Sequence, residues 1–173
     1  VLKSAVLLVT LLCVFPLFAT NPQKKEMKEL NVKKVSLANV AVENIPALLD
    51  KEKVAFQSIN TVNWKTFPYQ PEVQFRIAHT DDAILVHYKV KEASVRAVAA
   101  GDNGAVWEDA CVEFFSIPAG DGIYYNVECN CAGILLIGAG AGRENREHAP
   151  QEVMDKVQRW SSLGRQSFEE RVG

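Results

Sequence analysis

Apolar and polar side chains alternate residue by residue along two neighbouring stretches of the chain. In residues 73–77 and again in residues 84–90, a valine, isoleucine, phenylalanine or tyrosine occupies every second position. A period of two places these side chains on one face of a β-strand. The two stretches flank the turn-forming segment 80–82, so we expect an antiparallel hairpin.

Further short apolar stretches follow at similar spacing. We expect strands over residues 95–99, 112–117, 124–131 and 134–137, with turns at the glycine-containing segments 101–104 and 118–122. Short strands separated by Gly, Pro and Asp turns predict a mostly β fold, an antiparallel β-sandwich. We assign this sandwich to residues 61–173.

The segments on either side of these strands have different patterns. Within a lead-in over residues 21–60, residues 32–37 predict a short strand and residues 44–54 a short helix with Asn44 as its N-cap. Residues 138–143 form a glycine-rich run, which we interpret as a loop because it lacks the Gly-Lys-Ser/Thr ending of a phosphate-binding loop. Residues 150–160 predict a helix, and a polar tail follows it.

Residues 1–20 have the features of a signal peptide. Lys3 supplies the positive charge, residues 5–19 form an apolar run, and small residues near Ala19 suit cleavage. The run is shorter than the roughly 20 residues that span a bilayer. We therefore expect an exported protein in the periplasm, on the cell surface or outside the cell, with no transmembrane span in its mature form.

The charge content argues against two kinds of partner, and the cysteine content limits the number of disulfides. Lys and Arg number 19 against 21 Asp and Glu, a net charge of −2, and no sustained basic block exists. Neither nucleic acid nor an anionic membrane surface is expected as a partner. Removing the leader leaves Cys111, Cys129 and Cys131, an odd number that allows at most one intrachain disulfide and leaves its pairing open.

Candidate binding chemistry begins at the entrance of one predicted strand. Trp107 precedes Glu108, Asp109 and the strand over residues 112–117, at a position where loops collect binding groups. A tryptophan ring can stack on the C–H face of a sugar, while carboxylates and amides bond to its hydroxyls. A tryptophan buried in the sandwich core fits the pattern equally well.

Polar side chains then follow the next two strands. Glu113 has apolar neighbours on its strand face, where an unpaired carboxylate is costly. It either faces solvent beside a cleft or pairs with an arginine such as Arg76 or Arg96. Asn126 and Glu128 share the hydrogen-bonding face of the strand over residues 124–131, which lines a polar groove or is a solvated outer face.

Catalysis and metal binding find less support in the residues. Glu113 and Glu128 can meet the separation of about 5–10 Å that a glycosidase needs, but the short sandwich offers few other polar groups for a substrate cleft. The three histidines show no metal-ligand spacing, and oxygen-rich turns such as 81–82 are turn formers before they are calcium ligands. We expect a binding module and not an enzyme.

Several segments, in order, resemble the carbohydrate-binding module family 9-like proteins. The resemblance rests on Trp-Glu-Asp-x-Cys-Val-Glu-Phe-Phe at 107–115, on Tyr-Tyr-Asn-x-Glu-x-Asn-Cys-x-Gly at 124–133, on Asn63-Trp64, and on residues 71–79, 142–146 and 161–164. It covers roughly residues 30–173.

The resemblance implies an immunoglobulin-like β-sandwich that binds oligosaccharides or polysaccharides without catalysis. In the family's best-known members, two tryptophans clamp a sugar at the reducing end of glucan or xylan chains. By position, Trp107 resembles one clamp residue and Glu113 a hydroxyl acceptor, while Asn126 and Glu128 fall where the family places further polar contacts. No cofactor is implied, although structural calcium occurs in the family, and association with glycan-degrading enzymes is expected.

Two further expectations come from the same comparison. The family's second clamp tryptophan and closing strands lie beyond the position of Gly173, and Trp160 is a poor substitute, so we expect a sandwich that lacks its last strands. The alternative function is that of a related haem-binding, electron-transfer sandwich. That function requires Met154 with His79 or His87 as axial ligands.

Overall fold

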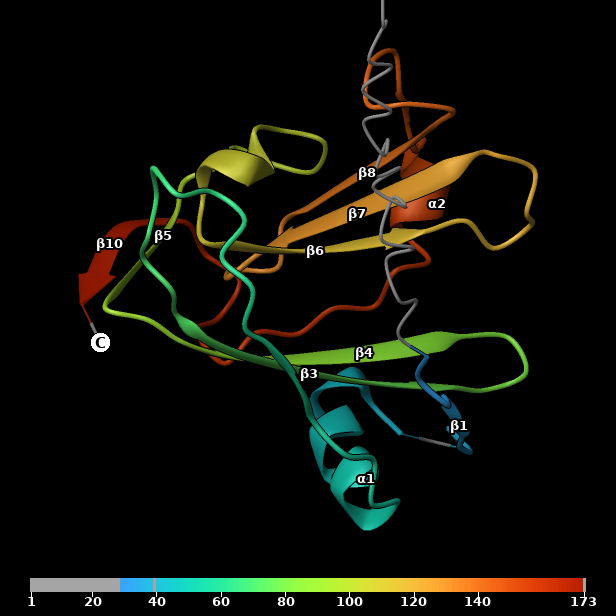
Figure 1. Cartoon of the computed structure of the whole chain (residues 1–173). Coiled ribbons are helices and arrows are strands. Elements are labelled where there is room, and N and C mark those ends of the chain that lie inside the picture. The colour runs from blue at the N-terminus through green and yellow to red at the C-terminus, as the bar shows by residue number, and fades with distance from the viewer. Residues whose placement is uncertain (1–28, 39, 173) are drawn as a thin grey trace, which may run out of the picture. The chain divides into compact units, whose positions relative to one another are not determined.

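The structure is a computed structural model that describes residues 29–38 and 40–172 (Figure 1). The chain divides into two units, Val1–Asn31 and Val32–Gly173, and the helices and strands of the described residues belong to the second. The predicted signal peptide, residues 1–20, lies outside the described residues. No helix in the described part is long and apolar enough to cross a membrane.

The first sheet is built around the hairpin of β3 (Glu72–His79) and β4 (Ile84–Lys91). These strands pair antiparallel along their whole length, which confirms the predicted hairpin. The other edge of β3 is shared by β1 (Lys33–Lys34) and β2 (Gln57–Ile59). Of these, β2 is antiparallel and β1 is parallel to β3, so the sheet departs from purely antiparallel pairing at one short strand.

One face of this sheet is covered by the helix α1 (Ile45–Lys51), which follows a single 3₁₀ turn, η1 (Val42–Asn44). Leu49 of α1 is fully buried and packs with Ala78 and Leu85. The helix is shorter than predicted, and the Asn44 side chain at its N-cap makes no capping hydrogen bond. Tertiary packing of its apolar side, more than capping, therefore holds this short helix.

The second sheet contains β6 (Cys111–Ser116), β7 (Tyr124–Asn130), β8 (Leu135–Gly140) and β9 (Glu147–His148). They are antiparallel and lie in chain order. One face packs on the short helix α2 (Gln151–Met154), whose Met154 is fully buried with Leu135 and Ile137.

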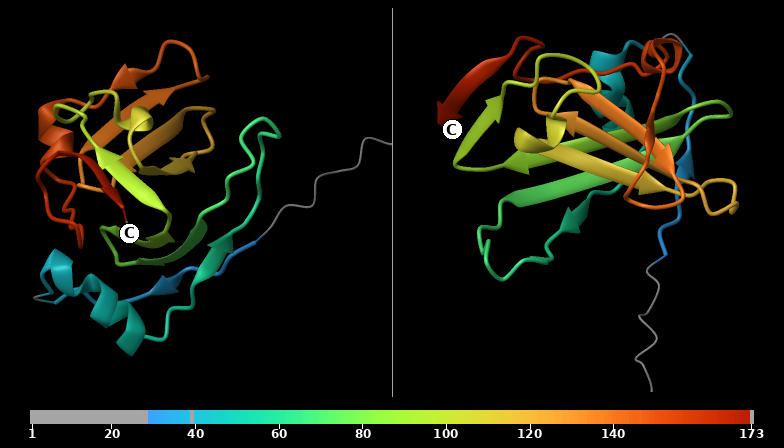
Figure 2. Two further views of the ribbon diagram at one scale, coloured as in Figure 1. Left: turned by 90° about the vertical axis from the view of Figure 1, so that its left-hand side faces the viewer. Right: turned by 90° about the horizontal axis from the view of Figure 1, so that it is seen from above.

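The two sheets are linked by a hydrogen bond from Tyr88 of β4. Its hydroxyl donates to the backbone carbonyl of Glu113 in β6 at 3.1 Å, and burial raises the pKa of Tyr88 to about 12. The fold is thus the predicted mostly β, antiparallel sandwich (Figure 2).

Three predicted elements near the end of the chain are wrong. The glycine-rich run is not simply a loop, because Gly138–Gly140 complete β8 and pair with β7. The helix expected over residues 150–160 ends at Met154. The tail contains β10 (Phe168–Val172), which pairs with β5 (Ser94–Ala97) across a register shift. In each case a pairing with a distant segment decided the local structure, and local composition could not show it.

Beyond the end of α2, Arg159 is held by Asp102. Two Arg159 nitrogens donate to the two Asp102 carboxylate oxygens at 2.7 and 2.6 Å, and the Leu135 amide donates to the same carboxylate at 3.0 Å. The Arg159 hydrogen bond, with help from the Leu135 amide, holds the pKa of Asp102 below its usual range. This pair ties the loop after β5 to β8 and to the chain beyond α2.

Replacing Asp102 by Asn should lower the free energy of unfolding at pH 7 by about 1–3 kcal/mol, the range for charge-assisted hydrogen bonds. Because the pKa of Asp102 is lowered in the folded state, its stabilisation is present above the unfolded pKa of about 3.9 and is lost as the pH falls through the folded pKa. Urea unfolding at pH 7 and in steps down to pH 2.5 should therefore show a shallower acid dependence for Asp102→Asn than for wild type.

Asp81→Asn is the matched control, because the Asp81 side chain is exposed and pairs only with Lys34 at the surface. Its effect should stay within about 0.5 kcal/mol. Equal losses for the two variants would contradict the assignment of Asp102 as a structural tie.

Candidate functional site

One face of the second sheet carries a dense set of polar and aromatic side chains. Directly opposed residues of an antiparallel pair point to the same side, and Glu113 opposes Glu128 while Phe115 opposes Asn126. Tyr124, two residues before Asn126, joins them on this side, with its ring centroid 6.1 Å from that of Phe115. We call these five residues the polar face. The opposite side of the sheet packs on the apolar cluster around Met154.

Two members of the polar face are buried. Asn126 is 1% exposed and Glu128 is 4% exposed, and the Asn126 amide donates to one Glu128 oxygen at 2.6 Å. The remaining oxygens, Asn126 Oδ1 and Glu128 Oε2, have no hydrogen-bond partner among the described residues. The predicted polar face thus exists, but as a buried acceptor pair and not as a fully solvated surface.

Leaving a buried acceptor unsatisfied costs about 1–3 kcal/mol, so native proteins rarely do so without a reason. Here two such oxygens lie two residues apart on one strand. Both are acceptors, so their complement is a molecule that offers O–H or N–H donors.

Glu113 is the exposed carboxylate of the set. Neither predicted arginine partner reaches it, because Arg76 donates to Asp50 at 2.6 Å and Arg96 to the Glu108 carbonyl at 2.6 Å. It therefore takes the solvent-facing alternative. Burial, followed by the charge of Glu128, raises the pKa of Glu113, while two nearby arginines act against that rise.

Those arginines, Arg143 and Arg146, belong to the turn between β8 and β9, and residue-by-residue reasoning did not single them out. Arg146 lies across the two strand glycines: a Cβ on Gly140 would stand 3.2 Å from Arg146 Cγ, and one on Gly138 3.5 Å from Arg146 Cβ. Gly138 and Gly140 oppose Asn126 and Tyr124, so the arginine covers the polar face.

The arginine also faces an aromatic ring of that surface, since its guanidinium carbon is 5.9 Å from the Tyr124 ring centroid. Two glycines at alternate positions of a strand are the sequence signal for such a close approach. The glycine-rich composition of residues 138–143 predicts a loop, so this signal is missed from the sequence.

Trp107 lies in the 3₁₀ turn η2 (Val106–Glu108), which packs against β6 and β7. Its neighbour Val106 is fully buried and anchors the turn, whereas Trp107 is 56% exposed. The buried-core alternative for this tryptophan is therefore wrong. Its exposed ring therefore belongs to a turn that contacts β6 and β7, the two strands that carry the polar face.

Asp109 fixes the position of η2. Its buried carboxylate accepts from the amides of Val98 and Ala99 at 2.9 and 3.0 Å and from the Asn130 side chain at 2.8 Å. Burial alone would raise the pKa of Asp109, but these hydrogen bonds and the nearby Arg96 charge together lower it. Asn130 is consequently a structural residue: its own oxygen accepts from the amides of Ala132 and Ile134.

The haem-binding alternative requires Met154 and either His79 or His87 on the two sides of one haem group, and the contacts of these residues do not fit that arrangement. Met154 is enclosed by the apolar cluster of β8, whereas His87 accepts from Arg76 at 3.1 Å and packs edge-on against Phe56. His79 is bonded to the Thr80 carbonyl. Among residues 29–38 and 40–172, Met154 and these two histidines therefore lie in separate surroundings.

Metal ligands and disulfides give no further candidate. Within residues 29–38 and 40–172, no group of three His, Cys, Asp or Glu side chains is arranged to hold a metal ion, and structural calcium stays a prediction. Cys111, Cys129 and Cys131 are unpaired thiols. Burial raises the pKa of Cys111 to about 12 and that of Cys129 to about 11, which makes both unreactive.

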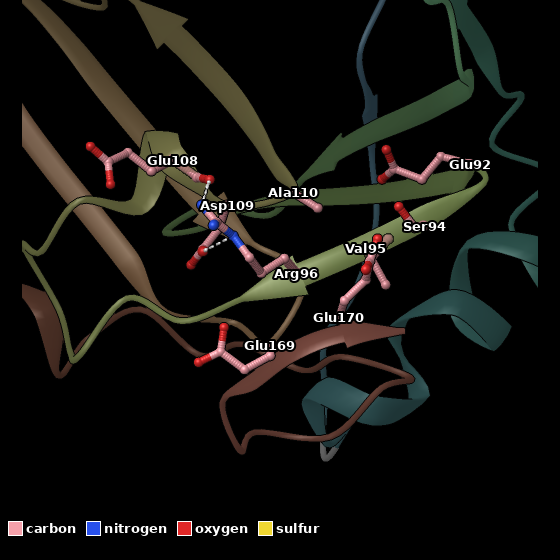
Figure 3. Close-up of a pocket in the computed structure, with 9 residues that line it drawn as sticks. All are labelled: Glu92, Ser94, Val95, Arg96, Glu108, Asp109, Ala110, Glu169 and Glu170. Carbon is pink, nitrogen blue, oxygen red and sulfur yellow. Dashed lines mark hydrogen bonds and ion pairs between the residues drawn. The ribbon is translucent and has the colours of Figure 1, made fainter. Parts of the chain in front are cut away.

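A separate open pocket of about 600 Å³ lies between β5, β10 and the end of η2 (Figure 3). Arg96 is its one basic side chain. Five acidic residues contribute to its lining, Glu92, Glu108, Asp109, Glu169 and Glu170, although the Asp109 side chain itself is buried. None of the predicted site residues lies in this pocket, although Glu108 directly follows Trp107.

This geometry, an antiparallel sandwich with buried acceptors, carboxylates and an exposed tryptophan near one sheet, suits a ligand with several hydroxyl groups, and the family match gives the class: carbohydrate-binding proteins. Residues 43–173 match carbohydrate-binding family 9. The chain belongs to that family.

One solved structure is closely similar. It is the crystal structure of "a putative carbohydrate-binding protein" from Bacteroides uniformis ATCC 8492, which is 63% identical and superposes with a TM-score of 0.80. The match covers 83% of this chain and 66% of that chain, so this chain spans less than two thirds of its relative. No curated protein matches the sequence.

Asp109→Ala should lower the free energy of unfolding by about 2–4 kcal/mol, because it leaves the amides of Val98 and Ala99 and the Asn130 side chain without an acceptor. Glu108→Ala is the matched control, since Glu108 is bonded through its backbone: its carbonyl accepts from Arg96 and its amide donates to Ala105. Thermal unfolding followed by circular dichroism measures both. A similar midpoint for the two variants would show that Asp109 does not anchor η2.

Proposed function

We propose that the polar face, together with Trp107, binds an oligosaccharide or polysaccharide without catalysis. The observation that carries the proposal is the pair of unpartnered buried acceptors, Asn126 Oδ1 and Glu128 Oε2. Sugar hydroxyls are donors of the right kind, and several are displayed on one ring. Membership of carbohydrate-binding family 9 supports the same class of ligand.

The remaining groups divide the work of recognition. Trp107 offers a flat apolar surface for the C–H face of a sugar ring, and the rings of Phe115 and Tyr124 border the buried acceptors. Glu113 accepts from further hydroxyls. Arg146 and Arg143 offset part of the negative charge at Glu113 and can donate to ring or hydroxyl oxygens.

A binding role fits these residues better than hydrolysis. Glu113 and Glu128 are opposed on neighbouring strands, as a glycosidase pair can be. However, one Glu128 oxygen is engaged by the Asn126 amide, and the same face has no further carboxylate at a directly paired position. An assay of reducing-sugar release from soluble xylan and glucan, with Glu113→Gln as the comparison, should detect no activity in either protein.

We further propose that the protein acts after export, beside enzymes that degrade glycans. The support is the predicted leader over residues 1–20. Cell fractionation with an antibody against the protein tests the location. Co-purification of a glycoside hydrolase with it tests the association.

Trp107→Ala should weaken sugar binding at least tenfold, because stacking on the exposed ring is lost while the fold is kept. Isothermal titration of a panel of mono- and oligosaccharides measures this change. Trp160→Ala is the matched control, since Trp160 is exposed to a similar degree, at 50%, but lies outside η2 and the second sheet. Equal affinities of wild type and Trp107→Ala would remove Trp107 from the site.

Sugar affinity should also fall at mildly acidic pH. The pKa of Glu113 is raised, so its carboxylate becomes protonated, and stops acting as a full acceptor, at a higher pH than an ordinary glutamate would. Titrations between pH 7.5 and 4 should show this loss in wild type. Glu113→Gln should bind more weakly at neutral pH and vary less with pH. A wild-type affinity that is constant down to pH 4 would contradict the role of Glu113.

A further inference from the structure

The loop between β2 and β3 displays three aromatic rings to solvent. Trp64 is 68% exposed, Phe67 73% and Tyr69 60%, and every residue from 58 to 70 is exposed. We call residues 60–71 the aromatic loop. It projects beyond the sheets in Figure 2. Exposed aromatic patches of this kind mark interaction sites in soluble proteins.

The loop is held in this conformation by its own bonds. The Phe67 amide donates to the Trp64 carbonyl at 3.0 Å, which closes a four-residue turn and brings those two residues within about 7 Å at Cα. The Ala93 amide donates to the Tyr69 hydroxyl at 3.0 Å. Pro68 and Pro71 further restrict the backbone. The rings are therefore presented before any partner arrives, and binding need not order the whole loop.

The side chains between the rings indicate a neutral, hydroxyl-rich ligand. Asn63, Thr66 and Gln70 supply amides and a hydroxyl, and Lys65 is the only charged residue of the loop. Insertion into an anionic membrane surface calls for a basic cluster, which the loop lacks. Flat apolar rings alternating with neutral hydrogen-bonding groups match the two kinds of surface that a sugar chain offers.

The aromatic loop is connected to Trp107 along the surface. Its Tyr69 contacts Ala93, and the residues on either side of Ala93, Glu92 and Ser94, line the open pocket of Figure 3. Glu108, which directly follows Trp107, lines the same pocket. A polar pocket thus lies between two aromatic surfaces.

We propose that the aromatic loop is a second glycan-binding surface, which contacts a different stretch of the same polysaccharide chain that Trp107 and the polar face hold. This inference rests on the proposed function for the class of ligand, a polysaccharide. It involves a different set of residues. Two weak contacts on one chain act as a bivalent pair, so their effect should appear on long glycans and not on short ones.

The test compares long and short ligands. The double variant Trp64→Ala/Phe67→Ala removes the two most exposed rings of the loop, and the indole N–H of Trp64 is the one side-chain donor lost with them. Affinity electrophoresis and titration with soluble xylan and mixed-linkage β-glucan, and with their trisaccharides, should show at least a tenfold loss for the polymers and less than a twofold loss for the trisaccharides. Tyr125→Ala/Trp160→Ala, two exposed rings outside the loop, is the matched control and should bind like wild type.

Trp107→Ala separates this inference from the proposed function. It should lose the trisaccharides and keep weak binding to the polymer, and adding the two loop substitutions should abolish that remainder. Unchanged polymer binding by the loop variant, or an equal loss for polymer and trisaccharide, would overturn the second surface alone. Absence of binding by wild type to these probes and to an array of immobilised plant, host and microbial glycans would overturn both. The single variants Trp64→Ala and Phe67→Ala give the same comparison if the double variant fails to fold by circular dichroism.

Discussion

The buried carboxylate of Asp109 is the constraint on which the candidate site depends. It accepts hydrogen bonds from the amides of Val98 and Ala99 after β5 and from the Asn130 side chain at the end of β7. The Asn130 oxygen in turn accepts from the amides of Ala132 and Ile134 in the turn before β8. One side chain therefore fixes three segments together. Since Asp109 directly ends η2, the same network sets where Trp107 is presented relative to the strands that carry Glu113 and Glu128.

Beyond this network, the polar face is shaped by small residues as much as by polar ones. Gly138 and Gly140 leave room for Arg146 to lie over β8, next to two glutamates that oppose each other on neighbouring strands. Like charges at opposed positions are unfavourable, and the arginines offset part of that cost. The two glycines therefore contribute to the charge balance of the polar face, because they let Arg146 approach it.

Much of this structure could be predicted from the sequence where the pattern is local. The period-two alternation of β3 and β4 and the turn between them correctly predict the hairpin, and the alternation within β7 separates its apolar side from its polar one. Sequence reasoning failed where a distant partner decides. The pairing of β10 with β5, and the approach of Arg146 to Gly140, join segments that no short window contains. The burial of Asn126 and Glu128 was missed for the same reason, because a polar strand face looks alike whether or not it is covered.

That burial determines how the site recognises its ligand. Asn126 and Glu128 satisfy each other through one bond and leave one acceptor each unmatched. An acceptor exposed to water loses its hydrogen bond to water when a ligand binds and gains one to the ligand, so the binding free energy changes little. An acceptor that is already desolvated in the folded protein has nothing to lose on binding, so each donor that a ligand brings contributes more than it would at the surface. Positions two residues apart on a rigid strand then favour ligands whose donors have matching spacing. The free-energy cost of burying two unsatisfied acceptors in the folded protein thus makes binding selective for ligands with matching donors.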